Sequence, residues 1–153
     1  MANSDTQSAL AFQEATKLTY INLLTKPPLY KSYSGLTRVP LPEAVPPRMP
    51  ALDAILGSAT TDVAPLDLAG IAILLHYSAG LIRKRELAMA GEVHYRAAAS
   101  AGALYPTELY LVCGELPGLS AGVYHYSPAD NALTELRKGD FRGNLAGAAA
   151  DES

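Results

Sequence analysis

The stretch that decides the fold is Arg96-Ala-Ala-Ala-Ser-Ala-Gly-Ala-Leu-Tyr-Pro-Thr-Glu-Leu-Tyr-Leu-Val-Cys113. From Ala97 to Ala103 it carries almost no side-chain bulk, so a flat ligand would lie directly against the main chain. From Glu108 to Cys113 it reads as an apolar strand. We therefore expect a turn around Ser100 that reads the polar edge of a flat ligand through backbone groups, followed at once by a sheet.

Two further strands are predicted after this stretch, at Gly122–Tyr126 and Ala132–Leu136. The turn-rich segment Ser127–Asn131 separates them. Parallel strands need a long crossover connection, so these short spacings favour an antiparallel meander.

A core helix is predicted before the small-residue stretch, at Leu68–Ala79, with Asp67 as its N-cap and Gly80 at its C-terminus. Its apolar residues lie on all sides, which is typical of a helix buried on most faces. Shorter helices are expected at residues 8–18, 51–56 and 140–150. The fold class is α+β, with antiparallel strands packed on a buried core helix.

The first 50 residues form a separate region, with the short helix followed by a Pro-rich extended arm. Seven of the 11 prolines lie between residues 27 and 50, which forces extended backbone. Interspersed apolar side chains indicate an arm that packs along a partner surface or a neighbouring domain. A disordered Pro-rich leader is the alternative.

Residues 51–153 are expected to form an incomplete domain. Few strands and one core helix make a poor closed unit, so the chain is expected to be part of a larger assembly. The charged residues around Arg83-Lys84-Arg85 predict a mobile loop over 83–96.

Composition excludes several classes of function. The net charge of −3 argues against a nucleic-acid surface, which needs clustered Lys and Arg. The longest apolar run, Leu68–Leu75, is far shorter than the roughly 20 residues of a membrane span. One cysteine and no secretory signal predict a cytoplasmic protein. The histidines share no metal-ligand spacing, so no metal site is expected.

The motifs together resemble a known family. The run from Ser100 to Val112, followed by Gly118-Leu-Ser-Ala-Gly-Val-Tyr-His-Tyr-Ser-Pro128, resembles the SagB-type dehydrogenases of the nitroreductase superfamily. The helix segment Pro65–Leu75 is similar to the one that precedes this motif in the family. The segments Glu14–Lys17 and Pro28–Lys31 resemble the leader of tandem members. The resemblance covers about residues 12 to 145.

The resemblance implies an FMN-dependent oxidoreductase that transfers hydride through flavin N5, including oxidation of azoline rings to azoles in peptides beside a cyclodehydratase. It implies that a second nitroreductase-like domain or a homodimer partner completes the flavin site. It assigns no catalytic residue within this chain. The residues it places at FMN are Ser100, Ala101, Gly102, Ala103, Leu104 and Tyr105.

One departure supports an alternative. The family usually holds the FMN phosphate with an arginine pair before the core helix, but no Lys or Arg occurs from Ala51 to Ile82. The family's later half, with further flavin contacts and a Lys-Tyr pair, is also absent. The alternative is a degenerate, non-catalytic nitroreductase-like domain that supplies interface structure to a catalytic partner domain.

Ser100 also has two other interpretations. A serine in an Ala/Gly turn is often a local cap whose hydroxyl bonds nearby backbone. Ala98–Gly102 also resembles a relaxed nucleophile elbow of a serine hydrolase. That motif needs a strand before the serine and a histidine after it, and a charged loop and only His125 are expected here.

Overall fold

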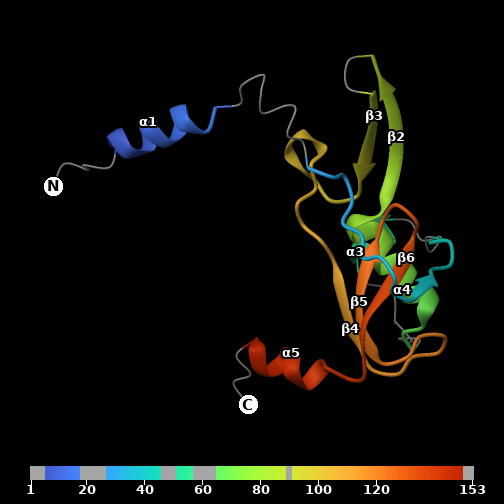
Figure 1. The fold of residues 1–153 in the computed structure, drawn as a ribbon. Coiled ribbons are helices and arrows are strands. Elements are labelled where there is room, and N and C mark those ends of the chain that lie inside the picture. The colour runs from blue at the N-terminus through green and yellow to red at the C-terminus, as the bar shows by residue number, and fades with distance from the viewer. Residues whose placement is uncertain (1–5, 18–26, 46–50, 57–64, 89–90, 150–153) are drawn as a thin grey trace.

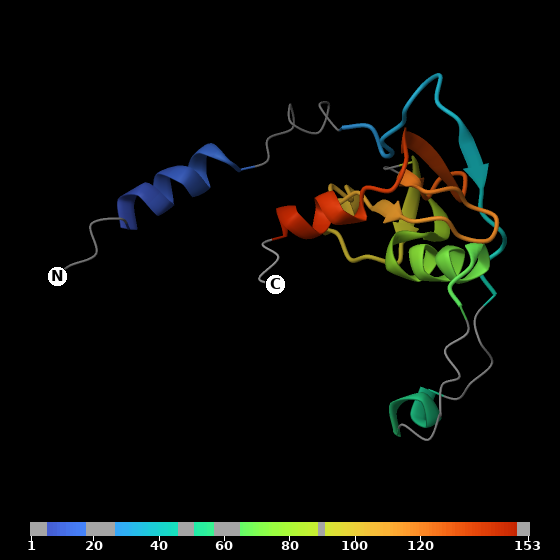
Figure 2. The same cartoon turned by 90° about the horizontal axis from the view of Figure 1, so that it is seen from below.

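The computed structural model describes residues 6–17, 27–45, 51–56, 65–88 and 91–149. Its centre is a four-stranded antiparallel sheet (Figure 1). Figure 2 shows one helix below this sheet and the extended N-terminal segment above it. The expected α+β fold, with antiparallel strands on a core helix, is confirmed.

The sheet has the strand order β1-β6-β5-β4. Its strands are β1 (Arg38–Pro40), β4 (Tyr110–Cys113), β5 (Gly122–Ser127) and β6 (Ala132–Lys138). Since β4 pairs with β5 and β5 with β6, all antiparallel, the predicted meander is confirmed, with strand ends shifted by one or two residues. The short edge strand β1 comes from the Pro-rich arm.

Side-chain alternation along β5 separates two different faces of the sheet. Tyr124 and Tyr126 are fully buried in the apolar core, where Tyr126 is paired with Leu133 of β6. His125 points to the opposite face, where its ring lies 5.1 Å from that of Tyr33 in the arm. This period of two gives the sheet one apolar face and one polar face, and both are covered.

Helix α4 (Leu68–Ala79) covers the apolar face. Its N-cap is as predicted, because Asp67 Oδ1 accepts a hydrogen bond of 2.8 Å from the Gly70 N–H. The prediction that α4 is buried on most faces is wrong. Its buried residues share one side, and Leu74 and Tyr77 are 57% and 53% exposed. The buried residues are Ile71, Ala72, Leu75 and Ala79.

The charged segment after α4 is a β-hairpin, which corrects the expectation of a mobile loop over 83–96. Among the described residues, strands β2 (Leu81–Leu87) and β3 (Gly91–Arg96) pair only with each other (Figure 1). Lys84 and Glu92 lie across the hairpin, with Nζ and Oε1 3.7 Å apart. Charged residues are accommodated because most side chains of β2 remain exposed.

The Pro-rich arm predicted over residues 27–50 is described over residues 27–45, and its last five residues lie outside the described ranges. The described part is extended as its prolines require, but it packs against its own chain. Strand β1 pairs with β6, and the Leu41 N–H donates to the carbonyl of Asn131 at 3.0 Å. Leu41 is buried in the core beside α4. The arm therefore supplies part of the sheet and covers its polar face.

Three other helices are near their expected positions: α1 (Thr6–Ala15), α3 (Ala51–Leu56) and α5 (Arg142–Ala148). The last three residues of the first predicted helix are not all described, because Leu18 lies outside the described ranges. Within the described segments, no helix combines the length and the apolar character needed to cross a membrane.

Neighbouring leucines on α4 give a matched test of the packing. Leu75→Ala should lower the free energy of unfolding by about 2–5 kcal/mol, because a large side chain that is 4% exposed leaves a cavity against the sheet. Leu74→Ala removes the same atoms from an exposed site and should change it by less than about 0.5 kcal/mol. Urea unfolding followed by circular dichroism measures both. Equal losses would mean that α4 packs by a different face.

Candidate functional site

The small-residue stretch folds into a strained turn between β3 and β4. A 3-10 helix, η1 (Ala101–Ala103), forms its centre. Gly102, Ala103 and Tyr105 have φ angles of 62°, 52° and 47°, in the left-handed region. Only glycine adopts this region without cost, and each other residue there costs about 1–3 kcal/mol. Such strain is concentrated at binding and catalytic sites.

The predicted ligand face of this turn is open. Ala101, Gly102 and Leu104 are exposed, and Ser100 and Ala103 are half-buried. A Cβ added at Gly102 would meet nothing closer than Leu104 Cγ at 3.8 Å. The main chain is therefore uncovered, as contact with a flat ligand requires, and FMN binding at these residues stays a prediction.

Two of the predicted residues hold the turn from beneath. The Ser100 hydroxyl accepts a hydrogen bond of 2.8 Å from the Tyr105 N–H, which is the local capping role considered above. Tyr105 is buried, and its own hydroxyl accepts a 3.0 Å hydrogen bond from the N–H of Arg96. These contacts connect the turn to the end of β3.

The serine hydrolase interpretation has no geometric support. The strand β3 does precede the turn, contrary to the expected charged loop. Ser100 nevertheless has φ −152°, an ordinary extended conformation, and its oxygen is engaged with Tyr105. His125 instead contacts the Glu108 carboxylate at 2.8 Å. No general base therefore contacts Ser100 in the part of the chain that the structure describes.

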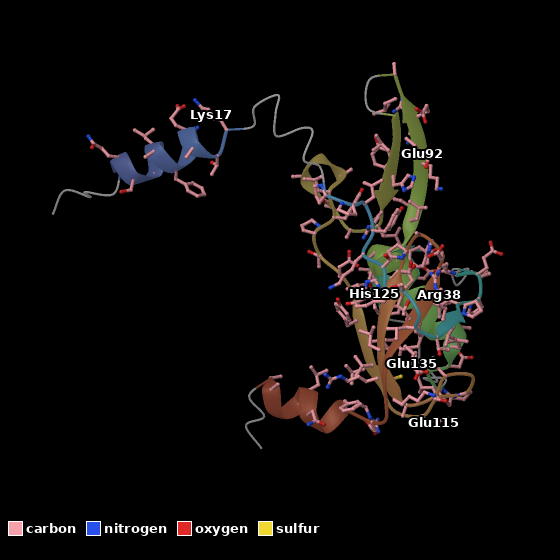
Figure 3. All side chains as sticks on the ribbon, viewed as in Figure 1. Lys17, Arg38, Glu92, Glu115, His125 and Glu135 are labelled. Carbon is pink, nitrogen blue, oxygen red and sulfur yellow. The ribbon has the colours of Figure 1, made fainter. Side chains whose placement is uncertain are left out.

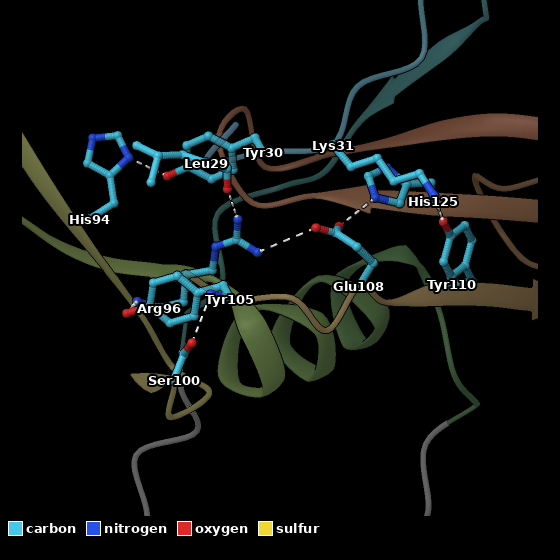
Figure 4. A network of polar contacts seen from close by, with 10 residues as sticks. All are labelled: Leu29, Tyr30, Lys31, His94, Arg96, Ser100, Tyr105, Glu108, Tyr110 and His125. Carbon is cyan, nitrogen blue, oxygen red and sulfur yellow. Dashed lines mark hydrogen bonds and ion pairs between the residues drawn. The ribbon is translucent and has the colours of Figure 1, made fainter. Parts of the chain in front are cut away.

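Arg96, at the end of β3, is the buried cation of this region (Figure 4). Its side chain is 2% exposed. The guanidinium carbon lies 4.7 Å from the ring centre of Tyr30 and 4.9 Å from that of Tyr105. Nη2 donates to the Leu29 carbonyl at 2.5 Å, and Nη1 lies 4.0 Å from Glu108. Two aromatic faces, one carbonyl and one carboxylate thus surround the charge.

A second cluster of polar side chains lies around the hydroxyl of Tyr110, at the start of β4. Lys31 Nζ donates to the Tyr110 hydroxyl at 2.9 Å, and the Tyr33 hydroxyl lies 2.9 Å from the same oxygen. The hydrogen bonds from Lys31 and then from Tyr33 lower the pKa of Tyr110, and the pKa of Lys31 is raised in return by Tyr110. Tyr110 is therefore more than the packing residue that its strand position predicted.

A cavity of about 620 Å³ lies between the arm and the segment after the turn, and we call it the arm cavity. Most of its wall is apolar, with Lys31 and Glu108 as its charged residues. Two of the predicted flavin residues, Leu104 and Tyr105, form part of this wall. The lining residues are Pro27, Pro28, Tyr30, Lys31, Ser32, Leu104, Tyr105, Pro106 and Glu108.

Sequence analysis missed the polar residues around the turn. Arg96 and Glu108 lie directly before and after residues 97–107, and this position beside the turn was the sequence feature that could have indicated a role at the site. No such sequence feature pointed to Tyr30, Lys31 or Tyr33 in the arm. Cys113, in contrast, is the buried small residue that was expected, and burial raises the pKa of its thiol.

No family model matches the chain. It is 41% identical over 72 residues to the trifolitoxin-processing protein TfxB of Rhizobium leguminosarum bv. trifolii, a match that covers 46% of this chain and 19% of that protein. It is also similar to a crystal structure from Anabaena variabilis assigned as a nitroreductase, with a TM-score of 0.58 and 26% identity. That likeness covers 92% of this chain.

The chain spans 28% of the Anabaena protein and 19% of TfxB. The structural likeness extends over nearly the whole chain, and 26% of the aligned residues are identical. These findings support a place in the nitroreductase-like superfamily, and the chain has a nitroreductase-like fold.

Proposed function

We propose that the chain is part of an FMN-dependent oxidoreductase of the SagB type, with the flavin ring against the Ser100–Tyr105 turn. The observation that carries this proposal is the exposed, left-handed main chain at Gly102, where an added Cβ would meet nothing closer than Leu104 Cγ at 3.8 Å. A turn that is strained, exposed above and anchored beneath is suited to a flat ligand read through backbone groups. The nitroreductase-like fold supports the same cofactor.

The residues of the turn would have distinct roles toward FMN. The backbone of Ala101 and Gly102 would face the ring, and the N–H groups that begin a 3-10 turn have no partner within it. Leu104 would add apolar contact, and Tyr105 would support the turn. Bound FMN would supply hydride transfer through N5, while the chain would orient the ring.

The phosphate of FMN needs a cation. The segment from Ala51 to Ile82 has none, and residues 57–64 lie outside the described ranges. Lys31 is the cation on the wall of the arm cavity that Leu104 and Tyr105 also line. A charge-assisted hydrogen bond is about twice as strong as a neutral one. Lys31 would therefore supply the positive charge that the arginine pair supplies in the family.

The proposal includes a partner. Leu74 and Tyr77 expose apolar surface on α4, and Ile82 on β2 is also exposed. A second nitroreductase-like domain or a second copy of the chain would cover this surface and complete the flavin site. The match to a toxin-processing protein favours a peptide substrate, such as azoline rings oxidised to azoles beside a cyclodehydratase.

The second candidate function is that of a degenerate domain that shapes an interface without binding flavin. Two observations favour it: the missing arginine pair, and the engagement of the Ser100 hydroxyl within the turn. Binding of FMN to the chain decides between the two.

Gly102→Val tests the predicted flavin face. The isopropyl group would occupy the space above the turn, so we expect FMN affinity to fall at least about tenfold, or 1.4 kcal/mol. Quenching of FMN fluorescence measures it. Gly35→Val is the matched control, because Gly35 also has a positive φ, of 74°, with nothing within 4 Å of an added Cβ. Equal affinity in both variants would remove Gly102 from the site, and no binding by the native chain would favour the degenerate domain.

Tyr105→Phe tests the support of the turn. It removes the acceptor of the buried Arg96 N–H, so we expect the free energy of unfolding to fall by about 1–3 kcal/mol. Tyr77→Phe, at a half-exposed ring on α4, should change it by less than about 0.5 kcal/mol. Urea unfolding measures both. A loss below 0.5 kcal/mol for Tyr105→Phe would show that this hydrogen bond does not support the turn.

A further inference from the structure

Three side chains connect the hairpin surface with the arm cavity. Tyr30 lines the cavity, and its hydroxyl lies 2.5 Å from Nδ1 of His94 on β3. Nε2 of the same ring contacts the Glu92 carboxylate. Figure 4 shows the contact between His94 and Tyr30, and Figure 3 shows Glu92 on the hairpin. Glu92 is 53% exposed, so this set of contacts begins at solvent and ends at the cavity.

The carboxylate determines which nitrogen of His94 carries the proton. A carboxylate only accepts, so Nε2 is the donor, and Nδ1 is then the nitrogen that can accept from the Tyr30 hydroxyl. Glu92 is ionised at neutral pH, since its hydrogen bond with His94 and the charge of Lys84 lower its pKa. An acid that orients an imidazole, and an imidazole that accepts from a hydroxyl, is the arrangement that activates hydroxyl groups in enzymes.

Tyr30 keeps its proton at rest. Burial raises the pKa of its phenol more than the nearby Arg96 charge lowers it, and Glu92 and Tyr105 also raise it. Proton release therefore requires a base in contact, which is the position of His94. The Arg96 guanidinium, 4.7 Å from the Tyr30 ring centre, would stabilise the negative charge that develops on the phenol.

We propose that Glu92, His94 and Tyr30 form a proton relay between solvent and the arm cavity. Tyr30 is the proton-transfer group, and Glu92 and His94 are positioning residues that act through it. The relay fits a ligand with a weakly acidic N–H or O–H group. As that group gives its proton to the Tyr30 oxygen, the phenol proton passes to Nδ1. The imidazolium that forms keeps its Nε2 proton and is stabilised by the Glu92 carboxylate, which is itself exposed to solvent.

An aryl sulfonyl fluoride tests the relay without any cofactor. The Tyr30 oxygen would attack sulfur, forming an O–S bond as the S–F bond breaks. Fluoride leaves, and the phenol proton passes to His94 Nδ1. Peptide mapping should show Tyr30 modified faster than the exposed Tyr77. Glu92→Gln and His94→Gln should each slow the modification of Tyr30 by about tenfold or more, because general-base assistance is worth at least that much.

Lys84→Met is the matched control on the same hairpin, because it removes the other ionic contact of Glu92 and leaves His94 in place. It should leave the rate at Tyr30 unchanged within about twofold, since a surface ion pair contributes little. An unchanged rate in Glu92→Gln or His94→Gln would overturn the relay. Slower modification of Tyr30 than of Tyr77 in the native chain would also overturn it.

The tautomer of His94 gives a second readout that does not depend on labelling. The chain has 3 histidines, so nitrogen-15 spectra can resolve each ring. We expect the Nε2–H tautomer for His94 in the native chain and a mixture of tautomers in Glu92→Gln. A proton on Nδ1 in the native chain would overturn the relay. Because neither measurement uses flavin, failure here is distinct from failure of the proposed FMN site.

Discussion

The buried guanidinium of Arg96 is the interaction on which the arrangement of the site depends. A charge removed from water costs several kcal/mol unless partners surround it. Its partners come from three separate segments: Leu29 and Tyr30 in the arm, Tyr105 in the turn, and Glu108 before β4. Satisfying one cation therefore fixes the position of all three. The turn stays open above because Tyr105 holds it from beneath.

The parts of the fold that the sequence predicted are those with local signals. Asp67 caps α4 within one turn of its own position, and the meander follows from turn residues and period-two alternation. The hairpin was missed because β2 and β3 pair only with each other among the described residues, and most side chains of β2 are exposed to solvent. A strand without a buried face shows no alternation of apolar and polar residues in its sequence. The charged side chains of Arg83, Lys84 and Arg85 are exposed to solvent, as expected, but they lie in a strand and not in a loop.

The burial of α4 shows a different limit. Its all-round apolar composition is correct, yet Leu74 and Tyr77 find no cover within the described residues. The composition of a helix indicates how much apolar surface it has, but not which part of the protein or which partner covers that surface. The arm shows the converse case, because its apolar residues indicated packing, and the cover proved to be its own sheet.

The openness of the turn was predictable because small side chains act locally. The polar network was not, since it joins Tyr30 with His94 and Lys31 with Tyr110, which are 64 and 79 residues apart. No periodicity encodes such pairs. Strain at Ala103 was equally hidden, because an alanine in the left-handed region has no sequence signal.

Arg96 also links the fold to the chemistry. Tyr30 and Tyr105 both contact it and both line the arm cavity, so the cation lies directly behind the cavity wall. Its Nε has no hydrogen-bond partner among the described residues. The positive charge of Arg96 would also stabilise a ligand that carries or develops negative charge in the arm cavity. The cation that orders the cavity walls would thus favour an anionic state of the ligand proposed to lie between them.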